Sequence, residues 1–166
     1  MRTNLQVLRM ELQLVDYFNY RQNVIVPNVS WGLFLHECDL LILTSFNYAY
    51  EVEIKISKSD LVKDSLKKHN HNSEKIKRLY FALPEKMQKY VDLVREDAGI
   101  IVVHPVDKFV SSDVRYGCEL MREPKDNSNA VCFTDDERFH LLHFGCMRMW
   151  GIKKKLMELQ RRKNEV

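Results

Sequence analysis

The sequence is poor in residues that break, cross-link or anchor a chain. Its 166 residues include only five glycines, four prolines and four cysteines. The low glycine and proline content excludes a disordered composition. The cysteines form no CxxC pair, which argues against a disulfide framework and fits a reducing compartment. No apolar run approaches the ~18 residues of a membrane span, and the first residues lack the apolar core of a signal peptide. We therefore expect a soluble, cytoplasmic protein without membrane association.

Charge of one sign is not in large excess either. The 26 basic and 23 acidic residues leave a net charge of +3, which by itself does not indicate a nucleic-acid partner. With 45% apolar and 30% charged residues, the composition is that of an ordinary globular protein. The length predicts a single domain over residues 1–166.

The most informative stretch is residues 50–57, in which charged and apolar residues alternate. This period of two predicts a strand with one face in the core. Glu51, Glu53 and Lys55 then share the opposite face. Two carboxylates can hold a hard divalent cation, and an ammonium beside them can polarise a water. The alternative is a solvated strand face that carries a Glu–Lys pair.

Another acid is expected beside this strand. Residues 38–44 form a short apolar run typical of a buried strand, and Asp39 stands at its start, where an unpaired carboxylate is costly. Residues 45–49 are typical of a hairpin turn. The hairpin brings Asp39 next to Glu53, and the two carboxylates then lie close to Lys55.

Asp39, followed on the next strand by Glu53-x-Lys55, resembles the core motif of the PD-(D/E)XK nuclease superfamily. Within it the chain is most similar to the MmcB-like DNA-repair proteins. In those proteins the (D/E)xK strand is followed by a serine, an aspartate, a basic helix and an aromatic strand that ends in proline. Residues 53–60 and 79–84 show the same order here.

The resemblance implies an α/β protein with a restriction-endonuclease-like fold, a mixed β-sheet core flanked by helices. Residues 1–105 would be the nuclease-like core, and residues 106–166 would add peripheral strands and a long C-terminal helix. Cys38 stands where the superfamily's name has a proline, which is a departure from the pattern.

The resemblance also implies DNA as the partner and Mg²⁺ or Mn²⁺ as the cofactor. Asp39, Glu53 and the backbone carbonyl of Ile54 would hold the ion. Lys55 would position the attacking water or stabilise the charge of the transition state.

Three further acids are candidates for the same site. Relatives carry a metal-associated glutamate on the first helix, which here is Glu11, and a solvent-facing role is its alternative. Glu51 lies on the same strand face as Glu53, and alternation alone does not rank the two. Glu37 shares a face with Asp39 by alternation.

The helix predicted after residue 57 is basic, and it leaves the strand just beyond the motif. Its lysines are expected to contact DNA phosphates without reading sequence, and a solvated helix face is the alternative. The four lysines are Lys58, Lys63, Lys67 and Lys68. The resemblance places Lys67 or Lys68 nearest the scissile phosphate.

The remaining elements follow from periodicity and from turn residues. Residues 69–73, which include two histidines, are interpreted as a solvated polar loop. Residues 109–123 are expected to form one or two peripheral strands. Helices are expected over 4–20, 58–69, 85–97 and from 135 onward, and strands over 23–27, 38–44, 50–57, 77–83 and 99–103.

The last helix carries an apolar stripe that is expected to pack on the sheet. The stripe includes Phe139, Leu142 and Trp150. Packing on the sheet is also our interpretation of its histidines and of Cys146, which resemble metal ligands in their spacing.

Three functions remain open. The first is a metal-dependent deoxyribonuclease that acts in DNA repair, as the resemblance implies, or in defence against foreign DNA. The second is a non-catalytic DNA-binding or scaffold protein on the same fold. The third is a folded domain without a nucleic-acid role. A homodimer is compatible with each of them.

Overall fold

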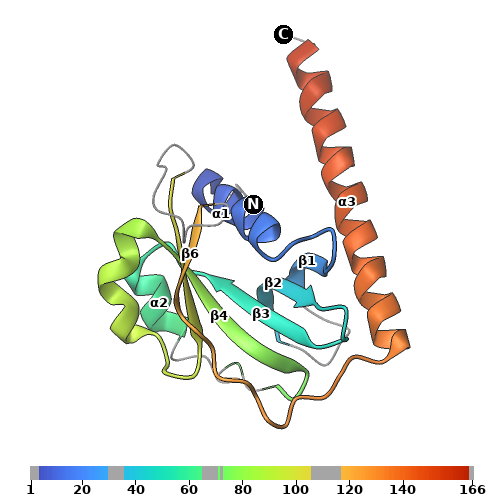
Figure 1. The fold of residues 1–166 in the computed structure, drawn as a ribbon. Coiled ribbons are helices and arrows are strands. Elements are labelled where there is room, and N and C mark those ends of the chain that lie inside the picture. Colours follow the sequence, from blue (N-terminus) through green and yellow to red (C-terminus); the bar gives the residue numbers. More distant parts are fainter. Residues whose placement is uncertain (1–3, 30–35, 65–70, 72, 106–116, 165–166) are drawn as a thin grey trace.

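The computed structural model describes residues 4–29, 36–64, 71, 73–105 and 117–164. The fold is α/β, with one mixed six-stranded sheet, flanking helices and a long C-terminal helix (Figure 1). The elements are α1 (Leu5–Tyr17), β1 (Val24–Val29), β2 (Cys38–Leu43), β3 (Ala49–Ile54), α2 (Lys58–Asp64), β4 (Ile76–Pro84), the 3-10 helix η1 (Glu85–Leu93), β5 (Gly99–Val103), β6 (Cys118–Arg122) and α3 (Asp135–Asn164).

The strands lie in the sheet in their chain order, β1 to β6. β1, β2 and β3 form antiparallel hairpins, whereas β3–β4 and β4–β5 are parallel and β5–β6 is antiparallel. Parallel neighbours need a crossover connection. α2 lies in the β3–β4 crossover, so the residues that follow the predicted motif strand return over the sheet.

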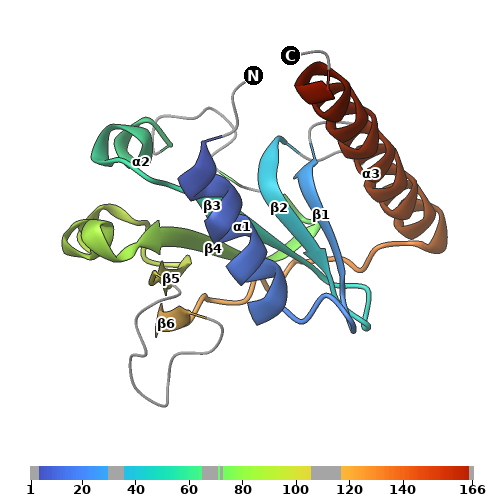
Figure 2. The same cartoon turned by 90° about the horizontal axis from the view of Figure 1, so that it is seen from above.

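One face of the sheet packs against α1, which crosses the strands (Figure 2). Met10 and Leu14 are the buried residues of this helix, and they contact the strand residues that point toward it. Leu5 and Leu12 are 60% exposed, so only a narrow stripe of the helix faces the sheet.

The opposite face carries two separate apolar clusters. The first joins β1, β2 and the start of β3 to Phe133 and to Leu141 of α3. The second joins β4 and β5 to Leu61 of α2 and Met87 of η1. The middle of β3 lies between the two clusters, and its charged residues are on this face.

The predicted helix over 85–97 is a shorter 3-10 helix. It is divided at Tyr90, whose φ of −112° is not helical. The five predicted strands are present within a few residues of the expected bounds. Of residues 109–123, the described part contains one strand, β6.

The expectation for α3 is wrong in one respect. Leu141 is fully buried, but Phe139 is 67% and Trp150 56% exposed, and the helix extends well past the sheet (Figure 1). Cys146 and both histidines of the helix are exposed as well. Beside the sheet a different face of the helix, with Leu141 and Phe144, packs on β1 and β2, and farther along the helix extends beyond the sheet (Figure 1).

Within the described ranges, no helix combines the length and the apolar character needed to cross a membrane.

Candidate functional site

Buried polar groups fill the space between the two apolar clusters. The strand register places Glu51 between Leu41 of β2 and Leu79 of β4, which belong to different clusters. Glu51, Glu53 and Lys55 are only 0%, 2% and 5% exposed. The solvated strand face is therefore wrong, and so is the expectation that only one face of this strand is buried.

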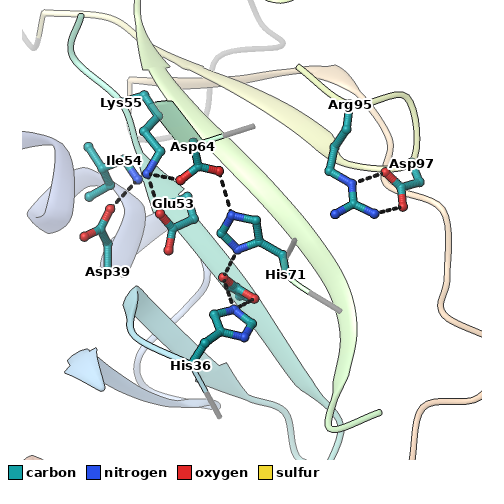
Figure 3. A network of polar contacts seen from close by, with 10 residues as sticks. His36, Asp39, Glu53, Ile54, Lys55, Asp64, His71, Arg95 and Asp97 are labelled. Atoms are coloured by element: carbon teal, nitrogen blue, oxygen red, sulfur yellow. Dashed lines mark hydrogen bonds and ion pairs between the residues drawn. The ribbon is translucent and has the colours of Figure 1, made fainter. Parts of the chain in front are cut away.

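Lys55 is held between two carboxylates. Its ammonium donates to Glu53 Oε2 and forms an ion pair of 2.8 Å with Oδ1 of Asp64, the last residue of α2 (Figure 3). Burial lowers the pKa of Lys55, but the two carboxylates outweigh it, so the pKa lies above its ordinary value. The side chain is a fixed cation at neutral pH.

His71 bridges two acids that come from different elements. Its Nε2 lies 2.6 Å from Asp64 Oδ2, and its Nδ1 lies 2.6 Å from Glu51 Oε1. With a carboxylate at each nitrogen, both nitrogens donate and the ring is an imidazolium. Burial lowers the pKa of His71, but these hydrogen bonds raise it to about 9. The solvated loop expected over 69–73 is wrong at His71, which is 6% exposed.

His36 completes the network from the segment that precedes β2. Its Nε2 is 2.8 Å from each carboxylate oxygen of Glu51, and its ring meets that of His71 edge to face, with centroids 5.2 Å apart. Burial raises the pKa of Glu51, but the hydrogen bonds from His36 and His71 outweigh it, and the net shift is downward.

The predicted hairpin is present and brings Asp39 to the motif strand. Asp39 Oδ2 accepts a hydrogen bond of 2.7 Å from the backbone N–H of Ile54 (Figure 3). Leu40 pairs with Val52, so the next step of the antiparallel register sets Asp39 beside Glu53. The pKa of Glu53 is raised by burial and by the charge of Asp39, against the opposing effect of Lys55.

The other predicted acids differ in position. Glu11 of α1 is half-buried, and its pKa is raised by burial and by the charge of Asp39. It therefore lies within the electrostatic field of Asp39. Glu37 is exposed, and no described contact links it to the network.

The predicted DNA-binding lysines are only partly described. Lys58 and Lys63 are exposed on α2, and Lys58 Nζ lies 5.3 Å from the centroid of the Tyr90 ring. Lys67 and Lys68 lie outside the described residues.

Potential metal ligands converge in two groups of described residues. His36, Glu51 and His71 form one, and Glu53, Asp64 and His71 form the other; in each, the ligand atoms lie within 4.8 Å of one another. Asp39 and Glu11 belong to neither group.

Sequence reasoning missed three members of the network: His36, Asp64 and His71. Asp64 had a usable signal, because it follows the buried Leu61 by three residues on α2 and such residues share a helix face. The two histidines lie outside the helices and strands, where the spacing of apolar residues does not indicate which side chains are buried.

A hollow of about 490 Å³ opens beside the network, and His71 is part of its lining. Lys77, Arg95 and Lys125 also line it. Arg95 is paired with Asp97 at its edge (Figure 3).

Comparisons with known proteins bear on the fold. No family model and no curated protein matches the chain. A solved structure from Silicibacter pomeroyi, described as a protein of unknown function, is similar to it, with a TM-score of 0.62 and 13% sequence identity over 96% of each chain. The two proteins share a fold. The likeness covers nearly the whole chain, but at 13% identity it shows the fold alone and no shared activity.

Proposed function

We propose that the protein is a metal-dependent nuclease that hydrolyses DNA phosphodiester bonds, on a restriction-endonuclease-like fold. The observation that carries the proposal is the buried ammonium of Lys55, fixed between Glu53 and Asp64 at the end of a strand whose backbone is bound by Asp39. The antiparallel β2–β3 hairpin and the parallel β3–β4 pair support the fold. The likeness to MmcB-like proteins supports a role in DNA repair.

The acids of the motif supply the oxygen ligands that a hard divalent cation prefers. Burial first, and then the charge of Asp39, raise the pKa of Glu11 and of Glu53, so a cation beside Asp39 would favour the ionised form of both acids. Mg²⁺ or Mn²⁺ would be held by Asp39 and Glu53, with the Ile54 carbonyl and Glu11 as further ligands. Such an ion supplies polarisation of the phosphate and of a water.

The charge of Lys55 restricts its role. A lysine whose pKa is raised stays protonated at neutral pH, so it does not act as a general base. It donates hydrogen bonds instead, and it is suited to orienting the attacking water or to stabilising charge on the phosphate. Asp64 acts through Lys55 as a positioning residue.

The exposed lysines of α2 are suited to phosphate contacts. Lys58 follows Lys55 by three residues and Lys63 follows it by eight, and both are exposed on the helix that leaves the motif strand. Contacts of this kind depend on salt and not on sequence. We therefore expect recognition of DNA structure instead of base sequence.

The test is Mg²⁺- or Mn²⁺-dependent cleavage of labelled single-stranded, double-stranded and branched DNA. Wild type is compared with Lys55→Ala and Asp39→Asn, and with Lys89→Ala as a matched exposed lysine. We expect cleavage by wild type and Lys89→Ala, and a loss of at least ~100-fold in the other two variants. Circular dichroism spectra establish that each variant is folded.

The opposite result has a defined meaning. If wild type cleaves no substrate with either metal, the nuclease proposal is rejected. Salt-sensitive DNA binding in that case favours the DNA-binding module, and no binding favours a domain without a nucleic-acid role.

A further inference from the structure

Three potential metal ligands, one of which is Glu51, converge at a point that does not include Asp39, Glu53 or Lys55. His36 Nε2 is 2.8 Å from Glu51 Oε1, and His71 Nδ1 is 2.6 Å from the same oxygen. All three ligand atoms lie within 4.8 Å of one another. They come from separate segments, before β2, within β3 and before β4, so the fold and not a local motif brings them together.

The surroundings of His71 match those of a metal-binding histidine. A ligating imidazole usually donates its other nitrogen to a carboxylate, which fixes the orientation of the ring. His71 Nε2 faces Asp64 Oδ2 at 2.6 Å, which leaves Nδ1 directed at Glu51. The ring also packs edge-on against Phe81, with centroids 5.8 Å apart, so both its plane and its position are set.

The donor types define the class of metal. Two imidazole nitrogens and one carboxylate suit zinc and similar divalent transition metals, whereas Mg²⁺ prefers oxygen ligands. We propose that His36, Glu51 and His71 form a binding site for a divalent transition metal of the zinc class, separate from the Asp39–Glu53 pair.

The two histidines connect the site to solvent and to the neighbouring hollow. His36 has a side chain that is 10% exposed, and His71 lines the hollow of about 490 Å³. A metal ion and a proton compete for His71 Nδ1, because only the deprotonated nitrogen coordinates. Metal binding at this site therefore releases protons.

The proposal does not rest on nuclease activity. Neither Asp39 nor Glu53 is among the three ligands. The two sites share Asp64, which contacts both Lys55 and His71, so His36→Gln and Asp39→Asn are the variants that test them separately. α3 offers an internal control, because His140 and His143 are exposed and are able to bind zinc at the surface.

The experiment uses the full chain after treatment with a chelator. Zn²⁺ is titrated by calorimetry in two buffers of different ionisation enthalpy, and Co²⁺ is titrated by visible absorption. We expect one equivalent of Zn²⁺, proton release, and a Co²⁺ spectrum with imidazole ligands. His36→Gln should weaken Zn²⁺ binding at least ~10-fold, while Asp39→Asn and His143→Gln should leave it unchanged.

Three results would overturn the proposal. They are the absence of stoichiometric binding, the same affinity in His36→Gln as in wild type, and a loss of binding in His143→Gln. A loss in Asp39→Asn alone would assign the metal to the nuclease site instead. Because His36 is the least buried ligand, its variant is expected to fold. The Zn²⁺ titration is repeated on a Glu51→Gln variant whose circular dichroism spectrum matches that of wild type, and its Zn²⁺ affinity is the second measurement.

Discussion

Lys55 is a buried cation whose removal leaves two buried carboxylates facing each other across an empty space. Breaking a buried ion pair in this way costs about 3–5 kcal/mol, because the remaining charges lose their partner without regaining water. We expect Lys55→Ala to lower the free energy of unfolding by this amount in urea denaturation. Lys89→Ala, at an exposed position, should change it by less than about 0.5 kcal/mol. Equal effects in the two variants would contradict the burial of Lys55.

Asp64 holds both Lys55 and His71, so its charge is expected to matter for activity. Asp64→Asn keeps the size of the side chain but removes one anion from between two cations. We expect cleavage kcat to fall about 10-fold or more with little change in DNA affinity, since the residue positions Lys55. Asp60→Asn, exposed on the same helix, is the matched control. A fall in affinity with kcat unchanged would mean that Asp64 contacts DNA.

The residues of the motif could be predicted, but their partners could not. Asp39 and Glu53 follow from local patterns, since a hairpin and an alternating strand are properties of short stretches. His36 and His71 reach Glu51 only through the tertiary fold. The burial of Glu51 was not predictable either, because alternation predicts which residues share a face but not whether that face is covered.

Among the elements, α3 is fixed to the body near its first turns. Leu141 is 0% exposed and packs with Phe133 and β1, whereas its neighbour Leu142 is 43% exposed. We expect Leu141→Ala to cost about 2–5 kcal/mol of unfolding free energy and Leu142→Ala less than about 0.5 kcal/mol. Thermal or urea unfolding of the pair measures the difference. The reverse order would place the other face of the helix against the sheet.

The start of α3 has a capping box formed by Thr134 and Glu137. Thr134 Oγ1 accepts from Glu137 N–H at 3.2 Å, and Glu137 Oε2 accepts from Thr134 N–H at 2.8 Å and from Lys75. Burial raises the pKa of Glu137, but these hydrogen bonds outweigh it, and the net shift is below the ordinary value of 4.5.

A carboxyl with a lowered pKa stabilises the fold above its unfolded-state pKa, and this contribution is lost as the pH falls through the folded-state value. Glu137→Gln keeps the cap but removes the charge. We expect wild type to be more stable than this variant by up to about 1 kcal/mol at pH 7, with the difference disappearing below pH 4.5. A difference that grows on acidification would contradict the sign of the shift.

The length of this helix was predicted, but its packing was not. A stripe of apolar residues indicates that one face of a helix is unlike the other. It does not show how far the partner surface extends. Here the face with Leu141 and Phe144 packs on the sheet instead of the face with Phe139 and Leu142, and α3 continues beyond the sheet (Figure 1).

For the whole molecule, the projecting end of α3 is expected to add little to the stability of the body. The described side chains from Cys146 to Arg162 are exposed. A chain that ends at Trp150 should therefore unfold within about 4 °C of the full chain, as measured by differential scanning calorimetry. A larger fall in the unfolding temperature would mean that the residues after Trp150 pack against another part of the protein.

Light scattering on the full and the shortened chain also tests the homodimer. If α3 forms the contact between two copies, the dimer would be lost on truncation.

The polar network has a consequence for the order in which the chain assembles. Every member from His36 to His71 belongs to one continuous stretch, so closing the network requires only short loops and little chain entropy. During synthesis this stretch leaves the ribosome before α3 has been made, and local contacts form early in folding. The charged centre of the protein can thus be in place while its longest helix is still being translated.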